Sequence, residues 1–382
     1  MILDYPNKKT EQEIIDNIKT GDLISDTGDH IRFNENILIE GDNLSALKTL
    51  IFDLDFKEKI DLIYIDPPFA TNNTFMIDAN ERVSTISNSL DGNIAYSDKL
   101  KGSEFIEFIR ERLVLLKMLL SPNGSIYLHI DYKIRHYVKL VMDEIFGINN
   151  FRNDITRIKC NPKNFNRKGY GNMKDLILFY SKSDDMIWHE PKAGYTQEDI
   201  ERLFKKVDEQ GRRYTTIPLH APGETKSSKE WKGQFPPKGR HWRTSPDILT
   251  EWEKQGLIEW SKNGVPRKKI YSEEREGKRI QDIWEFKDPQ YPNYPTEKNS
   301  NLLDLIIKTS SNENSIVLDC FCGSGTTLLA AQKSGRKWIG IDQSPEAIKA
   351  TIKKVSDSKT DLFNKNEFKR FKLKEYEEFE AV

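Results

Sequence analysis

Apolar runs alternate with amphipathic segments in both the first and the last third of the chain. Nearly continuous apolar runs at 60–65, 125–130, 315–321 and 336–342 predict strands buried on both faces, and 104–120 has the periodicity of a helix. Further strands are predicted at 36–40, 151–158 and 175–182, and further helices at 43–50, 132–147, 300–311 and 326–335. Strands separated by helices predict an α/β fold with a doubly wound, mostly parallel sheet.

The same pattern divides the chain into five segments. Residues 36–182 and 291–358 carry the alternating pattern and are predicted to be two halves of one domain. Residues 183–290 separate these halves with a less periodic, Gly- and Pro-rich insertion. Residues 1–35 form an N-terminal extension, and the Lys- and Glu-rich segment 359–382 is predicted to be a charged tail that is solvated or peripheral.

Charge is unevenly distributed along the 382 residues. The formal net charge is −1, but residues 205–280 contain 18 Lys and Arg against 11 Asp and Glu. Trp231, Phe235 and Trp242 are interleaved with these cations, a pattern typical of surfaces that bind phosphates and stack on bases. The candidate DNA-binding residues are Lys232, Arg240, Trp242, Arg243, Arg267 and Lys268. An irregular surface insertion without a ligand is the alternative.

Composition excludes several other classes of protein. Three cysteines, Cys160, Cys320 and Cys322, are too few for a disulfide scaffold, and the C-x-C pair lacks the partners of a zinc site, so no metal is expected. The longest apolar stretch, 113–120, is far shorter than the roughly 20 residues that a membrane span needs. With no signal-peptide pattern at the start, we expect a cytosolic protein.

The stretch VLDCFCGSGTT places a glycine loop between a buried strand and a helix. Gly323 and Gly325 follow Asp319, and backbone N–H groups at such a turn approach a ligand closely. Leu328 replaces the third glycine of the dinucleotide fingerprint. Asp342 lies 23 residues after Asp319 at the next strand end, where a carboxylate accepts hydrogen bonds from ribose. We therefore predict a nucleoside-cofactor site, with a tight structural turn as the alternative.

The stretch IDLIYIDPPF places an acid, two prolines and an aromatic ring at the end of another buried strand. Pro67 and Pro68 keep the backbone extended and leave carbonyls free to accept hydrogen bonds. Asp66 and the Pro67 carbonyl can hold the two hydrogens of a planar exocyclic amine while Phe69 stacks on its ring. An ordinary Asp-Pro turn is the alternative.

These motifs together resemble the β class of amino-methylating DNA methyltransferases, in particular the modification subunits of Type III restriction systems and their solitary relatives. DPPF with Thr71 and Asn72 precedes the basic insertion, and FCGSGTT comes last, which is the circularly permuted motif order of that class. The resemblance covers most of residues 36–358. It implies a Rossmann-like sheet with an inserted target-recognition domain.

The resemblance also implies S-adenosylmethionine as cofactor and double-stranded DNA as partner. It assigns catalysis to Asp66, Pro67, Pro68 and Phe69 and cofactor binding to Asp42, Thr296, Lys298, Asp319, Phe321, Gly323, Gly325, Thr326 and Asp342. An Asp in first place is usual for adenine-N6 methylation, on a base that leaves the duplex. A homodimer and an endonuclease subunit are further partners to test. A cytosine-N4 or RNA methyltransferase and a non-catalytic DNA-binding subunit are the alternatives.

Overall fold

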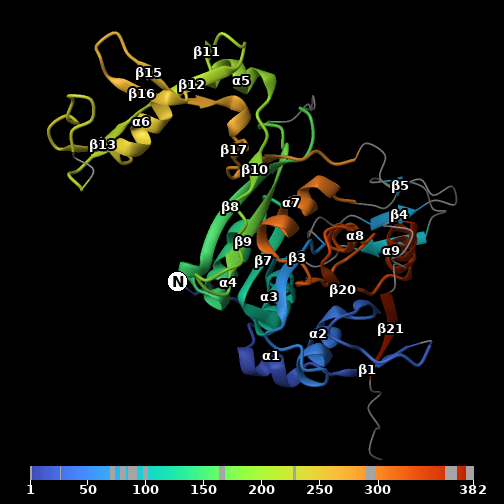
Figure 1. Cartoon of the computed structure of the whole chain (residues 1–382). Coiled ribbons are helices and arrows are strands. Elements are labelled where there is room, and N and C mark those ends of the chain that lie inside the picture. Colours follow the sequence, from blue (N-terminus) through green and yellow to red (C-terminus); the bar gives the residue numbers. More distant parts are fainter. Residues whose placement is uncertain are drawn as a thin grey trace, which may run out of the picture. The chain divides into compact units, whose positions relative to one another are not determined.

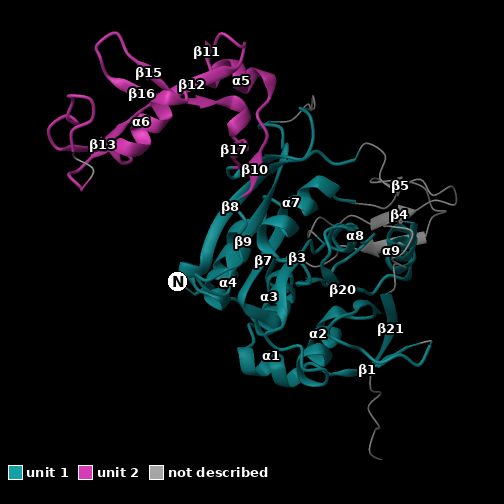
Figure 2. Cartoon of the chain, viewed as in Figure 1, with its two compact units in different colours: residues 1–190, 281–382 teal, residues 191–280 magenta. Residues whose placement is uncertain are grey.

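A computed structural model describes residues 2–25, 27–68, 74–77, 83–84, 93–97, 102–162, 168–226, 229–289, 297–357 and 368–375. The chain divides into two compact units (Figures 1 and 2). Unit 1 contains residues 1–190 and 281–382, and unit 2 contains residues 191–280. Unit 2 lies inside the predicted insertion, 183–290, and its ends are ten residues or fewer from those predicted.

Unit 1 is built on a ten-stranded sheet with the order β1-β21-β2-β20-β19-β3-β7-β9-β8-β18. Its strands are β1 (Gly21–Ile24), β2 (Asn36–Glu40), β3 (Ile60–Ile65), β7 (Leu120–Ile130), β8 (Phe151–Ile158), β9 (Lys174–Ser181), β18 (Ile283–Glu285), β19 (Ile316–Asp319), β20 (Lys337–Asp342) and β21 (Phe368–Glu375). The six strands from β21 to β7 are mutually parallel, whereas β1 and β9 are antiparallel to their neighbours. The prediction of a doubly wound, mostly parallel sheet is confirmed.

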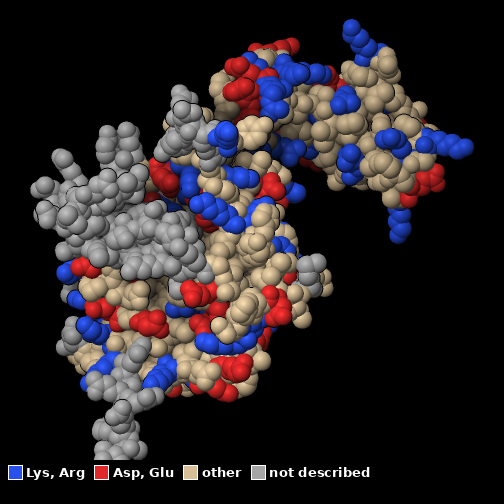
Figure 3. Space-filling view, turned by 180° about the vertical axis from the view of Figure 1, so that it is seen from behind, with Lys and Arg blue, Asp and Glu red and all other residues tan. Residues whose placement is uncertain are grey.

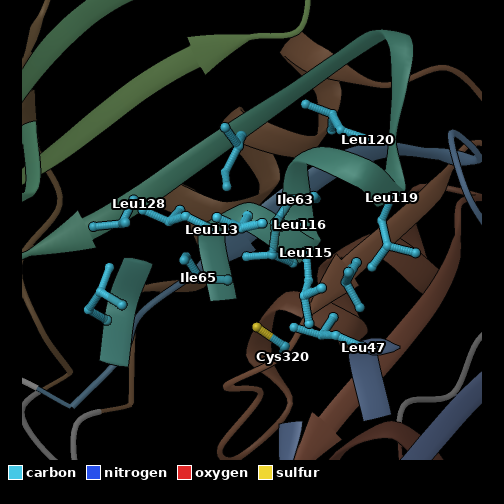
Figure 4. Close-up of a cluster of buried hydrophobic side chains, with 14 of the residues drawn as sticks. Leu47, Ile63, Ile65, Leu113, Leu115, Leu116, Leu119, Leu120, Leu128 and Cys320 are labelled. Carbon is cyan, nitrogen blue, oxygen red and sulfur yellow. The ribbon is translucent and has the colours of Figure 1, made fainter. Parts of the chain in front are cut away.

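Helices cover the sheet in two groups. Helices α1 (Glu11–Asn17), α2 (Asn43–Phe52), α3 (Gly102–Leu119) and α4 (Arg135–Phe146) form one group, and α7 (Ser300–Ser310), α8 (Thr326–Lys333) and α9 (Pro345–Asp357) form the other. Ile63 and Ile65 of β3 share a buried cluster with Leu113 and Leu116 of α3 (Figure 4). Side chains on the other face of the strands contact the second group of helices. For example, Tyr127 Oη of β7 lies 2.8 Å from Ser310 Oγ of α7.

Residues 368–375 of the C-terminal segment form a strand, which differs from the solvated or peripheral element that the local charge predicts. Residues 368–375 form β21, which pairs in parallel with β2 and antiparallel with β1 inside the central sheet. Phe371 and Leu373 are 4% and 9% exposed and alternate with lysines along the strand. This period-two alternation is the signature of a half-buried strand, and it outweighs the high local charge.

The remaining described strands of unit 1 form a separate small sheet, β5-β4-β6, from β4 (Thr74–Ile77), β5 (Val83–Ser84) and β6 (Asn93–Ser97). In the part of the chain that the structure describes, no helix is long and apolar enough to cross a bilayer.

Unit 2 is organised by one four-stranded antiparallel sheet, β11-β12-β16-β15, and a short hairpin, β13-β14. Its elements are β10 (Lys192–Ala193), α5 (Gln197–Leu203), β11 (Lys206–Val207), β12 (Arg213–Pro218), β13 (His220–Pro222), β14 (Arg240–Trp242), α6 (Pro246–Lys254), β15 (Ile258–Trp260), β16 (Pro266–Tyr271) and β17 (Lys278–Arg279). Leu219, Trp231, Trp242, Leu249 and Ile258 form its core. Ser245 accepts a hydrogen bond as N-cap of α6, which Pro246 begins.

Deleting β21 should destabilise unit 1. A chain that ends at residue 357 loses the strand between β1 and β2 and the two buried side chains Phe371 and Leu373. Each large buried side chain is worth about 2–5 kcal/mol, so the free energy of unfolding in urea should fall by several kcal/mol. A chain that ends at residue 375 keeps the strand and is the control; equal stability of the two truncated chains would contradict the role assigned to β21.

Candidate active site

Four acidic residues meet at one edge of the central sheet. Strands β2, β20, β19 and β3 are adjacent and parallel, so their carboxyl ends lie side by side. Asp342 and Asp319 end their strands, Asp66 directly follows β3, and Asp42 lies two residues beyond β2. Ligands of open α/β sheets bind at this edge, and the fold therefore brings together acids that are up to 300 residues apart in the sequence.

Of the two carboxylate oxygens of Asp66, one forms an ion pair and the other has no partner among the described residues. Its Oδ2 lies 2.6 Å from Lys298 Nζ, in an ion pair whose side chains are 15% and 10% exposed. Its Oδ1 is buried and has no hydrogen-bond partner among the described residues. An acceptor in this state costs free energy unless a ligand supplies a donor. Pro67 is buried beside it, and Phe69 lies outside the described residues.

The glycine loop is fixed by hydrogen bonds to the acids around it. Gly323 N–H donates to Asp342 Oδ2 at 2.9 Å, and Phe321 N–H donates to Asp319 Oδ1 at 3.0 Å. Gly325 is the N-cap of α8 and has a left-handed backbone, φ 73°, and a Cβ there would lie 2.8 Å from Thr351. Only glycine fits this turn, because both its conformation and the space exclude a side chain.

The electrostatics of this edge favour a ligand with positive charge. The pKa of Asp319 is raised to about 7, mainly by burial and also by the nearby carboxylates of Asp66 and Asp342, although hydrogen bonds from Thr327 and the Phe321 N–H partly offset the rise. Burial also raises the pKa of Asp342, although N–H donors of Ser344 and Gly323 partly offset that effect. Buried carboxylates that gather without enough cations are the usual surroundings of a binding site.

Asp42 stabilises the start of a helix in addition to lying at the ligand-binding edge of the sheet. It is the N-cap of α2, where its Oδ2 accepts a hydrogen bond from Ser45 N at 2.9 Å. Its Oδ1 lies 3.6 Å from Arg112 Nη2. Asn43 Nδ2 then donates to the Cys320 carbonyl at 2.8 Å, which joins the start of α2 to the glycine loop.

Lys354 contacts the glycine loop, and the sequence analysis did not identify it as a site residue. Lys354 Nζ donates to Ser324 Oγ and Thr326 Oγ1, both at 2.8 Å, and to Glu297 Oε1 at 2.5 Å. Lys354 lies on the amphipathic helix α9 with two other lysines, Lys349 and Lys353, so nothing in the sequence separates it from them. Thr296, which the resemblance assigns to the cofactor site, lies outside the described residues.

A buried polar row beneath Asp66 was also missed. Tyr64 Oη lies 2.9 Å from His129 Nδ1, and His129 Nε2 lies 3.3 Å from Asp175 Oδ2, which also accepts from Arg157 at 3.4 Å. Burial lowers the pKa of His129, and the charge of Lys298 lowers it further. The signal available in the sequence was a charged or polar residue inside otherwise apolar strands, as in SIYLHI and DLILFY.

The candidate DNA-binding residues differ in exposure. Lys232, Arg240 and Arg243 are exposed, whereas Arg267 and Lys268 are half-buried. Arg267 donates to Thr216 Oγ1 and the Thr216 carbonyl, and Lys268 Nζ lies 3.4 Å from the centre of the Trp252 ring. Trp242 is only 2% exposed and donates from Nε1 to the Lys229 carbonyl. The prediction that its ring contacts DNA is wrong, because the ring is part of the core of unit 2.

Replacing Asp319 by Asn should change the pH dependence of stability. The folded-state pKa of Asp319 lies above its unfolded value, so its ionisation destabilises the wild type as pH rises from about 4 to about 7. Between pH 5 and pH 8 the wild type should lose about 2–3 kcal/mol relative to Asp319→Asn, whose amide oxygen still accepts from Phe321. Urea unfolding at pH 5 and pH 8 measures the difference; one that stays constant with pH would contradict the raised pKa.

Comparison with known proteins shows the family to which this chain belongs. The family model N6_N4_Mtase, described as DNA methylase, matches residues 60–354. The Type II methyltransferase M.EcaI of Enterobacter cloacae is 38% identical over 366 residues, which are 93% of this chain and 77% of M.EcaI. The probable Type III HindVI Mod subunit of Haemophilus influenzae is 26% identical over 390 residues, 81% of this chain and 48% of that subunit. The solved M1.HpyAVI–SAM complex is 19% identical with a TM-score of 0.42, covering 83% of this chain and 98% of that one. The chain belongs to the N6/N4 DNA methylase family.

Proposed function

We propose that this protein transfers a methyl group from S-adenosylmethionine to the N6 amino group of adenine at a specific site in DNA. The observation that carries the proposal is the state of Asp66, whose Oδ1 is buried, unpartnered among the described residues and located at the ligand-binding edge of the sheet. An exocyclic amine is a donor that suits this acceptor.

Asp66 and the backbone beside it account for the activation of the amine. The amine of adenine is a weak nucleophile because its lone pair is delocalised into the ring. Acceptors that hold both hydrogens, Asp66 Oδ1 and the Pro67 carbonyl, favour the tetrahedral nitrogen that forms during attack. The Asp66 carboxylate also stabilises the positive charge that develops on that nitrogen. Phe69 is proposed to stack on the base that has left the duplex.

The residues at the sheet edge fit S-adenosylmethionine. When bound, this cofactor supplies a methyl group on a positively charged sulfonium, and it also carries an ammonium group. Buried Asp319, with a pKa raised to about 7, gains from a cation at this edge, and Asp342 is placed to accept hydrogen bonds from ribose. Gly323 and Gly325 give the loop its left-handed turns, with φ of 51° and 73°, and the loop is proposed to let the cofactor approach the backbone closely. The proposed cofactor residues are Asp42, Thr296, Asp319, Phe321, Gly323, Gly325, Thr326 and Asp342.

Unit 2 is proposed to be the target-recognition part. Lys and Arg side chains are spread over the face of unit 2 seen in Figure 3. Arg240 and Arg243 lie on and directly after β14, and both are exposed. Exposed cations of this kind bind phosphates, whereas the half-buried Arg267 and Lys268 contact Thr216 and the Trp252 ring within unit 2.

Two further parts of the proposal concern base choice and partners. The Asp in the first position of DPPF favours adenine-N6, and cytosine-N4 is the competing reaction at the same acceptors. The protein is proposed to act in the bacterial cytoplasm, and a homodimer and an endonuclease subunit are the further partners to test. Both partners stay predictions, and sedimentation of the purified chain tests the first.

The direct test uses Asp66→Ala. Purified protein, radiolabelled S-adenosylmethionine and unmethylated genomic DNA are incubated, and the nucleosides are then separated. Wild type should yield N6-methyldeoxyadenosine, while the variant should lose at least about 1,000-fold in rate because the acceptor of the amine is gone. Calorimetry should show cofactor binding by both proteins. N4-methyldeoxycytidine in place of methyladenine would assign the competing reaction, and a fully active variant would remove Asp66 from catalysis.

The role of unit 2 is tested by reversing Arg240 and Arg243 to Glu. Removal of two phosphate contacts should weaken binding to duplex DNA by roughly 10-fold or more, and should lower the slope of log affinity against log salt by about 2. The control is Lys308→Glu with Lys333→Glu, which makes the same change in net charge on unit 1. Equal effects of the two double variants would show that the change in net charge, rather than this surface, governs binding.

A further inference from the structure

Two consecutive residues of unit 1 contact the two halves of the proposed site. Lys298 Nζ lies 2.6 Å from Asp66 Oδ2, at the catalytic strand. Glu297 Oε1 lies 2.5 Å from Lys354 Nζ, which also donates to Ser324 and Thr326 of the glycine loop. The segment 297–299 therefore joins the carboxylate that is proposed to hold the amine to the loop that is proposed to hold the cofactor.

Both ion pairs lie in surroundings where their geometry matters. The side chains of Lys298 and Asp66 are 10% and 15% exposed, and those of Lys354 and Glu297 are 14% and 12% exposed. Little water screens such pairs, so their charges interact more strongly than those of surface pairs, and the loss of one partner is costly.

The segment itself is anchored at its C-terminal end. Asn299 is the N-cap of α7, with its Oδ1 accepting from Asn301 N at 2.9 Å, and its Nδ2 donates to the Lys287 carbonyl at 2.8 Å. Lys298 thus extends from a backbone held by a helix cap on one side and by the Glu297–Lys354 pair on the other. A lysine side chain has high rotamer entropy, and this anchoring reduces the space that its ammonium group can explore.

We propose that Lys298 is a positioning residue for Asp66 and that segment 297–299 is the strap that places it. A carboxylate rotates about its terminal torsion, and both of its oxygens are equivalent until one is engaged. Lys298 engages Oδ2, which fixes the plane of the carboxylate and leaves Oδ1 for the amine. This inference rests on the proposed function, because it concerns the orientation of the acceptor for the target amine.

The competing role for Lys298 is that of a cofactor ligand, which the family resemblance implies. The two roles predict different kinetics. A positioning residue acts on the methyl-transfer step and changes the rate at saturating cofactor. A cofactor ligand acts on binding and changes the dissociation constant of S-adenosylmethionine.

The experiment compares Lys298→Met, Lys298→Arg and Lys308→Met with the wild-type protein on unmethylated DNA. Lys308 is an exposed lysine of α7, so Lys308→Met is a matched control for the same substitution ten residues away. We expect Lys298→Met to lower the single-turnover rate at saturating cofactor by about 10- to 100-fold. Its dissociation constant for S-adenosylmethionine, measured by calorimetry, should stay within about threefold of wild type. Lys298→Arg should recover part of the rate because it keeps the cation, and Lys308→Met should behave as wild type.

The inference is overturned if Lys298→Met binds S-adenosylmethionine at least tenfold more weakly and keeps the wild-type rate at saturation. An unchanged rate with unchanged binding overturns it as well. Should Lys298→Met fail to fold, Glu297→Gln tests the strap without touching the lysine: it should lower the same rate about three- to tenfold, and an unchanged rate would exclude the strap. A wild type that methylates no DNA contradicts the proposed function instead, so the two failures are distinguishable.

Discussion

The structure depends on one electrostatic constraint, which is the gathering of carboxylates at the carboxyl ends of adjacent parallel strands. Asp66, Asp319 and Asp342 lie at neighbouring strand ends, and burial raises the pKa of Asp319 to about 7. Such a cluster is unfavourable by itself, because each charge loses hydration and repels the others. Nearby polar and charged groups offset part of this cost. Lys298 pairs with Asp66, and N–H groups of the glycine loop donate to the other two acids. A cofactor that carries positive charge would complete the compensation.

The order of the strands explains why a site can be assembled from both ends of the chain. β3 enters the sheet next to β19, although more than 250 residues separate them in the sequence. The insertion of unit 2 between these strands does not disturb their pairing, because the chain leaves and re-enters unit 1 near residues 190 and 281. The end of β3 and the glycine loop therefore share one edge of the sheet.

Much of this arrangement could be predicted from the sequence, because strands buried on both faces leave strong patterns. Apolar runs before Asp66 and before Asp319 indicate buried strands. The glycines after Asp319 indicate a ligand-binding loop at the end of its strand. Side-chain pairing leaves no such pattern. Lys298 resembles any lysine before a helix, and its partner Asp66 is more than 230 residues away in the sequence. β21 was missed for a different reason, since its lysines hide the alternation of Phe371 with Leu373. The opposite error concerns Trp242. Its position among cations predicted a DNA-contacting ring, but the ring belongs to the hydrophobic core of unit 2.

The measurement that tests the central claim most directly is modification-sensitive single-molecule sequencing of DNA from methylation-free cells that express this protein. The account predicts N6-methyladenine at one short sequence motif throughout the genome, and no such mark in cells that express Asp66→Ala. Genomic DNA without any methylated base, from cells in which the protein is folded and binds S-adenosylmethionine, would contradict the claim that DNA adenine is the substrate.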